Sequence, residues 1–333
     1  MARVFLTGGS GFIGGSLIER LHDRGDHVVG LARSDAAARV LSERGAEVVR
    51  GNALDEDSMA AGMRGCDLAY HVAGLNSHCP KDPGLMMRVN VEGPQNAVRA
   101  AAAAGIERVV LTSSAASVGE AQGTVGTEDS PHRGSYLSVY DRSKHEGELA
   151  AFAAAHHEEV ELVAVNPSSV QGPGRTHGTG AIAIAYLNGK LPAFLDVPVS
   201  IVDIEDCADA HLLAAERGRP GRRYVLNGAT IPSTRALEIV SRLGGVEHKV
   251  RMIPPPVARA AAAASDGVYK LKEGTSPLCA ARVRTLLHGH RYDASRSERE
   301  LGLTYTPVEE TFARIVQWAV AEGLVEQPLA VAG

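Results

Sequence analysis

The sequence predicts an α/β fold with a doubly wound parallel sheet and a smaller lobe after it. Three observations predict this. Apolar, strand-like runs alternate with helical patterns through the first half. A glycine-rich turn joins the first run to the first helical pattern, and the alternation stops after Pro167. Parallel neighbours need crossover connections, which are right-handed, so helices are expected on both faces of the sheet.

The first predicted strand is the apolar run at residues 1–6, and the second is at 27–33. The remaining strands are expected at 47–50, 68–73, 108–112 and 161–165, with helices at 57–63, 85–104 and from Tyr140 to about residue 155. The strands are rich in Val, Leu and Ala without strict alternation, which is typical of parallel strands buried on both faces.

The 333 residues suit one large domain or two moderate ones. We expect a dinucleotide-binding core at residues 1–166, with 199–228 returning to it. Residues 167–198 and 229–333 are expected to form mainly a substrate-binding lobe. Such a lobe would close over the carboxyl ends of the strands, where open α/β sheets bind ligands.

The turn after the first strand carries the glycines of a dinucleotide site. Gly9, Gly11 and Gly14 fit G-x-G-x-x-G, and Gly8 with the last two fits G-x-x-G-x-x-G. Glycines permit the tight turn, and the following helix N-terminus favours a pyrophosphate. The sequence therefore predicts a Rossmann fold in which Gly8, Gly9, Ser10, Gly11, Phe12, Ile13 and Gly14 bind cofactor. The alternative is a structural turn without a ligand.

The end of the second predicted strand indicates which dinucleotide binds. NAD-specific sites usually place a carboxylate there for the ribose 2′-hydroxyl, but this chain has Ala32, Arg33 and Ser34. A guanidinium can bind a 2′-phosphate with two hydrogen bonds. We therefore expect NADP, with Arg33 and Ser34 in contact with it. The nearby Asp35 leaves NAD open, with Arg33 simply solvated.

Composition excludes several other classes of function. The net charge is −5 and aromatic residues make up 4%, so the chain lacks the basic tract and stacking surface of a nucleic-acid-binding protein. No apolar run is long enough to span a membrane. Because the N-terminus is used directly as a strand, no signal peptide is expected, and the predicted location is the cytoplasm.

Cysteine and histidine spacing predicts neither a disulfide nor a metal site. Cys66, Cys79, Cys207 and Cys279 are far apart, and we expect them to be reduced and not to bind metal. The histidine clusters at residues 156–157 and 288–290 have no carboxylate or cysteine at metal-ligand spacing. They are predicted to be surface or loop residues.

The segment after residue 138 carries a candidate proton-transfer pair. Tyr140 and Lys144 are four residues apart, about one helical turn, so they share a helix face. A nearby ammonium group lowers the pKa of a phenol from its usual value of about 10. Ser113 and Ser114 end the fifth predicted strand, where a hydroxyl can hold a substrate oxygen. Alternatively, the pair is a chance surface spacing and the serines only close the strand.

Together these motifs resemble the extended short-chain dehydrogenases, the NAD-dependent epimerase/dehydratase family. The resemblance runs nearly from end to end. It includes TGGSGFIG, the segment from Asn52 to Asp55, HVA at 71–73, VNVEG at 89–93, the double serine, the Tyr140–Lys144 pair, NPSSVQGPG at 166–174 and YDASR at 292–296. It is nearest to the dihydroflavonol-reductase-like and hopanoid-associated epimerase-like branches.

The resemblance implies a role for each matching residue. It implies that Ser114 and Tyr140 are catalytic, that Lys144 binds the nicotinamide ribose and lowers the Tyr140 pKa, and that Asn90 lies near the active site. It also implies cofactor contacts from Asn52, Ala53, Val72, Ala73, Gly74, Pro167, Ser169 and Val170. Asn52 stands where the family more often has Asp.

The implied reaction is hydride transfer between a nicotinamide and a small-molecule ketone, aldehyde or alcohol. Two alternatives stay open: a nucleotide-sugar epimerase or dehydratase with tightly bound NAD, and a non-catalytic NADP-sensing module. Gln171 replaces the tyrosine of the common sugar-nucleotide pattern. Substrate contacts are expected within 75–83, 175–195 and 254–291, with Asn76, Arg175 and His177 as candidates alongside Ser114. Related proteins pair through helices near Asn90 and Tyr140, so a homodimer is a further expectation.

Overall fold

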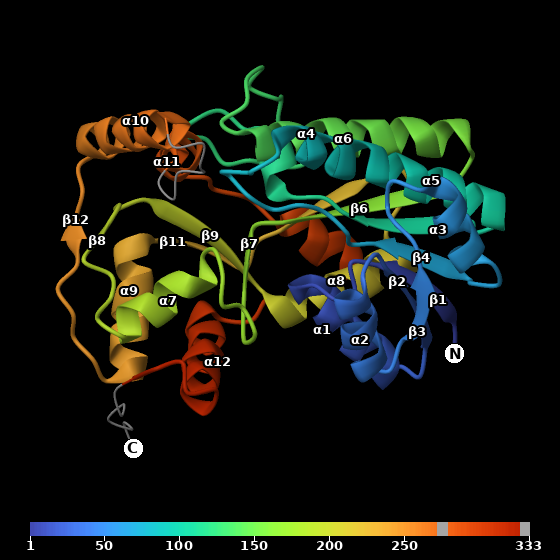
Figure 1. Ribbon diagram of the computed structural model, residues 1–333, viewed down its shortest axis with the longest axis horizontal. Coiled ribbons are helices and arrows are strands. Elements are labelled where there is room, and N and C mark those ends of the chain that lie inside the picture. The colour runs from blue at the N-terminus through green and yellow to red at the C-terminus, as the bar shows by residue number, and fades with distance from the viewer. Residues whose placement is uncertain (272–278, 327–333) are drawn as a thin grey trace.

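The computed structural model describes residues 1–271 and 279–326, and its centre is a seven-stranded, wholly parallel sheet (Figure 1). The strand order is β10-β6-β5-β4-β1-β2-β3. The strands are β1 (Arg3–Thr7), β2 (His27–Ala32), β3 (Glu47–Arg50), β4 (Leu68–His71), β5 (Arg108–Thr112), β6 (Glu161–Pro167) and β10 (Arg223–Leu226). Strands β2 and β3 are added on one side of β1, and β4, β5 and β6 on the other, so the strand order reverses between β1 and β4. This confirms the doubly wound prediction and creates the switch point where such sheets bind ligands.

Helices cover both faces of this sheet. One face is covered by α3 (Glu56–Met63), α5 (Gly93–Ala104) and α6 (Val139–His157), and the other by α1 (Phe12–Asp23), α2 (Asp35–Glu43) and α8 (Ile204–Arg217) (Figure 1). Alternate residues of β1 therefore point to different cores. Phe5 packs with Met59 of α3, whereas Leu6 packs with Ile18 of α1. All four side chains are fully buried.

Among the described residues, the second lobe comprises two small sheets and five α-helices. A three-stranded sheet has the order β11-β9-β7, and a two-stranded sheet pairs β12 with β8. Its elements are β7 (Ser169–Gln171), α7 (Gly180–Leu187), β8 (Ala193–Phe194), β9 (Pro198–Asp203), β11 (Ala229–Pro232), α9 (Ser233–Gly244), β12 (Arg251–Met252), α10 (Pro255–Leu271), α11 (Ala280–His288) and α12 (Val308–Ala321). Figure 1 shows this lobe beside the parallel sheet.

The predicted return of residues 199–228 to the core is only partly correct. Helix α8 and strand β10 do return, because β10 pairs with β6. Strand β9 does not, because it pairs with β7 and β11. It is apolar enough to suit either sheet, so only the pairing decides its place.

The long predicted helix at 85–104 is interrupted. It consists of α4 (Pro83–Met87), a π-helical turn at Arg88–Glu92 and α5. Such turns inside α-helices often occur at functional sites. This one carries Asn90, whose side chain is buried.

Two of the four cysteines are not reduced as predicted. Cys79 and Cys279 form a disulfide across 200 residues of sequence, whereas Cys66 and Cys207 are free and buried. Sequence spacing cannot reveal such a pair, because the fold brings the two Cα atoms to 6.1 Å. Residues 272–278, part of a predicted substrate segment, lie outside the described residues. Within the described residues, no helix combines the length and apolar character needed to cross a membrane.

Candidate functional site

The glycine loop between β1 and α1 is folded so tightly that side chains would not fit. Gly8 has a φ of +76°, and a Cβ there would lie 2.7 Å from the Ala73 nitrogen. A Cβ on Gly14 would lie 2.3 Å from the Gly8 carbonyl oxygen. The loop therefore packs closely between the start of α1 and the residues that follow β4, as a dinucleotide turn requires.

The N-terminus of α1 is suited to an anion. Its N-cap residue, Gly11, makes no side-chain capping hydrogen bond. Backbone N–H groups at Phe12 and Ile13 lie in the first turn, where the helix dipole favours negative charge. The glycine loop and this uncapped turn together fit the pyrophosphate of a dinucleotide.

Arg44 is a residue of this loop that the sequence prediction missed. Its Nη1 atom donates hydrogen bonds to the carbonyl oxygens of Gly9 at 2.8 Å and Gly11 at 3.2 Å. It lies at the end of α2, over the Cα of Gly15. No motif marks it, because it reaches the loop only through the packing of α2 on the sheet.

The end of β2 presents Arg33 to solvent. The side chain is exposed, and among the described residues no ion pair involves it. Ser34 caps α2 by accepting a hydrogen bond from the Ala37 nitrogen at 3.2 Å. Asp35 pairs with Arg50 at 2.6 Å, which turns its carboxylate toward that guanidinium. Arg33 is therefore free for an anionic group.

Three of the predicted cofactor residues, Asn52, Ala53 and Ala73, follow the ends of β3 and β4. Asn52 is exposed, and its Oδ1 accepts a hydrogen bond from the Leu54 nitrogen at 3.1 Å. The Ala53 carbonyl accepts a bond from Asn96, which secures the loop to α5. The Ala73 nitrogen donates to the Thr7 hydroxyl at 3.1 Å, tying the end of β4 to β1.

The two serines after β5 differ in their surroundings. Ser114 Oγ accepts a hydrogen bond from the Ala116 nitrogen at 3.2 Å and lies within bonding reach of the Tyr140 phenol. Ser113 Oγ is buried and has no partner among the described residues. A buried network lies behind Ser114, where Asn166 donates to its carbonyl oxygen and to Ser117. The structure thus pairs Ser114 with the phenol.

Tyr140 is half-buried near the start of α6, whose N-cap is Ser138. Burial raises the pKa of the phenol above its usual value, the Ser114 hydrogen bond lowers it, the Asp141 charge raises it and the Arg175 charge lowers it. The net direction is upward. The phenol is therefore protonated at neutral pH and is a proton donor.

Lys144 is buried and bonded to the backbone at the end of β5. Its Nζ donates a hydrogen bond to the Thr112 carbonyl at 2.9 Å. Burial lowers the pKa of Lys144 to about 8, against an opposing effect of Glu148. The predicted action of Lys144 on the Tyr140 phenol stays a prediction, and burial is the largest influence on the pKa of each group.

Asn90 is buried, and its side-chain amide is fully engaged. Oδ1 accepts from the Leu75 nitrogen at 2.7 Å, and Nδ2 donates to the Leu75 carbonyl and to Ser143 Oγ, each at 2.9 Å. These bonds tie the loop after β4 to the π-turn and to α6. Its geometry suits a positioning residue that holds the loop at Gly74 beside Lys144.

Of the substrate candidates in the second lobe, Arg175 contacts the start of α1 beside the glycine loop. Its guanidinium lies 5.7 Å from the Phe12 ring centroid, and its Nη1 bonds the Val170 carbonyl. Ser169 bonds Thr179 at 3.1 Å. Pro167, at the end of β6, is buried.

Among the described residues, no hydrogen bond or ion pair links the other two lobe candidates, Asn76 and His177, to the site. Asn76 is exposed. His177 is also exposed, and its hydrogen bond is with the neighbouring Thr176.

His78 is the second residue that the sequence prediction missed. Its ring contacts the Tyr140 ring edge-on, with centroids 5.6 Å apart. It precedes the disulfide residue Cys79, and the Cys279 sulfur lies 3.5 Å from the His78 carbonyl. The disulfide therefore joins the loop beside Tyr140 to the start of α11.

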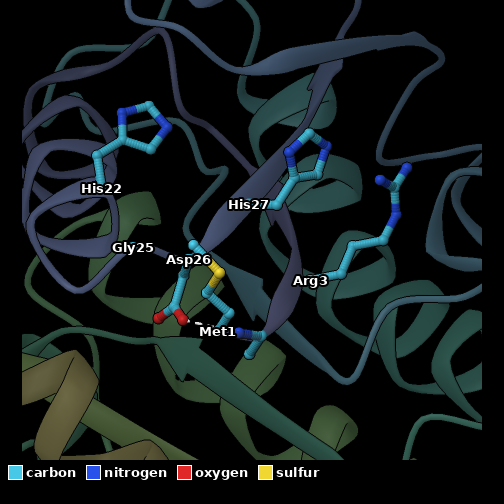
Figure 2. A pocket seen from close by; sticks show the side chains of 7 residues that line it. Met1, Arg3, His22, Gly25, Asp26 and His27 are labelled. Atoms are coloured by element: carbon cyan, nitrogen blue, oxygen red, sulfur yellow. Dashed lines mark hydrogen bonds between the residues drawn. The ribbon is translucent and has the colours of Figure 1, made fainter.

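The hollow drawn in Figure 2 is not part of this site. It lies where β1 and β2 begin, whereas the glycine loop and the serines lie where strands end. Its lining residues are Met1, Ala2, Arg3, His22, Gly25, Asp26 and His27. Asp26 accepts a hydrogen bond from the Ala2 nitrogen at 2.8 Å, which fastens the chain start there.

His288 and His290 were predicted to be surface or loop residues; His290 does lie in a loop, but neither side chain is on the surface. His288 is buried and His290 is largely so. Glu120 supplies the carboxylate that the local sequence lacks, with Oε1 3.3 Å from His288 Nε2 and 2.5 Å from His290 Nδ1. The partner was invisible in the sequence because it lies about 170 residues away.

Known proteins are similar to this chain in both sequence and fold. Residues 4–226 match the family model described as NAD dependent epimerase/dehydratase family. A Synechocystis sp. protein provisionally named dihydroflavonol 4-reductase is 30% identical over 331 residues, covering 97% of this chain and 96% of its own. Cinnamoyl-CoA reductase 1 of Oryza sativa is 32% identical over 259 residues, covering 72% and 75%. The crystal structure of gox2253 has a TM-score of 0.85 at 26% identity, covering 98% of this chain and 100% of that one.

Proposed function

Because the chain belongs to the NAD-dependent epimerase/dehydratase family, we propose that it is an NADP(H)-dependent oxidoreductase of a small-molecule ketone, aldehyde or alcohol. The observation that carries this proposal is the pairing of the Tyr140 phenol with the Ser114 hydroxyl. Both groups lie at the sheet edge that carries the glycine loop. The relatives named as reductases support the same class of reaction.

The proposed roles follow from the protonation states. Tyr140, with its raised pKa, donates the phenolic proton to a carbonyl oxygen as that oxygen gains negative charge. The Ser114 hydroxyl holds the same oxygen by a hydrogen bond. Lys144 is mostly charged at neutral pH and supplies a positive field beside Gly74. In the oxidation of an alcohol the same proton moves back to Tyr140.

A bound nicotinamide would supply or accept the hydride. The glycine loop and the uncapped start of α1 would hold the pyrophosphate of the dinucleotide, and Arg33 with Ser34 would hold its 2′-phosphate. The pairing of Asp35 with Arg50 supports this proposal, because that carboxylate is already engaged by a guanidinium.

The first test of the proposed reaction is the Tyr140→Phe variant. We expect the NADPH-dependent turnover of a carbonyl panel to fall by about 10²–10⁴-fold, because the proton donor is lost. The dissociation constant for NADPH should stay within about twofold of wild type. Tyr136→Phe is a matched control, because that tyrosine is exposed. Unchanged turnover in Tyr140→Phe would refute the assigned role.

The test of the cofactor is the Arg33→Asp variant. A carboxylate there repels a 2′-phosphate, so NADPH should bind at least about tenfold more weakly while NADH binding holds or improves. Arg39→Asp makes the same charge change at an exposed position of α2 and serves as the control. Equal losses in the two variants would show a general field effect and count against a specific 2′-phosphate contact.

The nucleotide released from purified protein distinguishes the main alternatives. A nucleotide-sugar epimerase or dehydratase retains NAD and shows no net redox, whereas a reductase releases its cofactor. Mass spectrometry that finds stoichiometric NAD, without NADPH oxidation on a carbonyl panel, would favour the epimerase. NADPH binding without any turnover would favour a cofactor-sensing module.

A further inference from the structure

A buried cluster of one carboxylate and two imidazoles lies outside the proposed catalytic groups. It consists of Glu120, in the loop between β5 and α6, His288, the last residue of α11, and His290. One ligand-capable atom from each lies within 4.8 Å of the others. Glu120 is only 1% exposed and His288 only 8%.

The local backbone is arranged to bring both rings to the carboxylate. Gly289 ends α11 in the left-handed conformation, with φ +67°, and the chain reverses there. The centroids of the two imidazole rings are 4.5 Å apart. A backbone bridge between Gly126 and Tyr292 holds the two distant segments together. The backbone of the fold therefore holds the two histidines beside Glu120.

Hydrogen bonds alone leave this cluster incompletely satisfied. Both imidazoles approach the same oxygen, Oε1 of Glu120, while Oε2 is buried without a partner among the described residues. His290 Nε2 is also buried and unpartnered there. His290 Nδ1 faces both Glu120 Oε1 and the Tyr292 hydroxyl, the latter at 3.0 Å. A single proton on Nδ1 cannot be donated to the carboxylate while that nitrogen accepts from Tyr292.

We propose that Glu120, His288 and His290 form a binding site for a divalent transition-metal ion of the Zn²⁺ type. One carboxylate and two imidazoles are a recurrent zinc ligand set that leaves one position open, and two nitrogen ligands disfavour Mg²⁺ and Ca²⁺. Ligand atoms around a tetrahedral zinc lie about 3.3 Å apart, which follows from bond lengths of about 2.0–2.1 Å. The His288–Glu120 separation is 3.3 Å, whereas His290 Nδ1 lies 2.5 Å from the same oxygen, so these two atoms would move apart when the ion binds.

The position of the site indicates what the ion would do. It would fasten the C-terminal end of α11 to the loop that leads into α6, while the Cys79–Cys279 disulfide fastens the N-terminal end. The ion would thus hold the lobe against the segment that carries Tyr140.

Zinc titration of the chelator-treated full chain tests this proposal. We expect the wild type to bind one equivalent of Zn²⁺ in calorimetry, with a rise in Tm. The Glu120→Gln and His290→Gln variants should bind at least about tenfold more weakly. The two unpaired cysteines are buried, so thiols should not compete for the ion. No reductant is added, because reductants chelate zinc and open the disulfide.

The double variant His156→Gln/His157→Gln is the matched control. These two histidines are exposed at the end of α6, and Glu158 pairs with His157 there. The double variant should bind zinc as the wild type does. The proposal is overturned if the wild type binds no stoichiometric zinc, or if Glu120→Gln binds as tightly as the wild type.

If the variants do not fold, a spectroscopic measurement on the wild type still tests the site. Wild-type protein loaded with Co²⁺ should show intense visible absorption bands, as tetrahedral cobalt does, and added Zn²⁺ should displace them. Absence of these bands in the folded wild type would also refute the site.

Discussion

At the scale of single residues, burial shifts two ionisable groups of α6, Tyr140 and Lys144, toward their neutral forms. The phenol of Tyr140 has a raised pKa, and the pKa of Lys144 is lowered to about 8. Each shift follows from desolvation as the largest cause. At neutral pH the phenol still carries its proton and the amine is still mostly charged. This is the pair of states that carbonyl reduction needs.

The lowered pKa of Lys144 predicts a pH-dependent stability. The unfolded chain keeps this proton up to a pH of about 10.5, whereas the folded chain releases it near 8, so the unfolded state binds more protons in between. The free energy of unfolding of the wild type, relative to Lys144→Met, should therefore rise across that window. The full shift corresponds to about 3 kcal/mol.

Denaturant unfolding of both proteins at several pH values between 7 and 10.5 measures this difference. The Thr112 carbonyl loses its donor in the variant, but that loss does not depend on pH. A pH-independent difference between the two proteins would contradict the assigned pKa.

At the scale of elements, the cofactor turn is held by its neighbours. Thr7 Oγ1, at the end of β1, accepts from the Ala73 nitrogen and contacts His71 Nδ1 at 3.2 Å. Burial and the Lys144 charge lower the pKa of His71 to about 3, so this imidazole is neutral. Arg44, at the end of α2, bonds two carbonyls of the turn from the other side. The glycine turn is thus held in place from outside, by the residues at the end of β4 and by Arg44 at the end of α2.

Removal of the Arg44 contacts is predicted to loosen the turn. Hydrogen bonds from a charged donor contribute about 1.5–3 kcal/mol, so Arg44→Ala should raise the NADPH dissociation constant by at least about tenfold. The KM for the carbonyl substrate at saturating cofactor should change little. Arg39→Ala, on the exposed side of the same helix, is the control for fluorescence titration. An unchanged NADPH affinity would show that the turn holds its shape unaided.

At the scale of the whole molecule, α11 joins the two lobes at both ends. The disulfide connects its first turn to the loop beside Tyr140, and His288 at its last turn meets Glu120. The geometry around Tyr140 therefore depends on Cys279 and His288, which lie about 140 and 150 residues after it in the sequence. Substrate affinity should respond to both contacts.

Opening the disulfide is predicted to weaken substrate binding and stability together. The double variant Cys79→Ser/Cys279→Ser should lose about 2–5 kcal/mol of unfolding free energy, because the bond closes a long loop. Its KM for the carbonyl substrate should rise several-fold while NADPH affinity is retained.

Wild type treated with dithiothreitol should behave like this variant, and the variant itself should not respond. The measurements are denaturant unfolding and steady-state kinetics. Identical KM and stability in reduced and oxidised wild type would exclude a role for this bond.

The sequence by itself determined the parallel sheet, the glycine turn and the Tyr140–Ser114 candidates, because each depends on local periodicity or on a short motif. The tertiary structure alone decided the place of β9, the Cys79–Cys279 disulfide and the meeting of Glu120 with His288. It also set the burial of Tyr140, which is the largest influence on the pKa of that phenol. The physical reason is the same in each case: pairing partners distant in the chain and the extent of burial are set by packing, which no local pattern encodes.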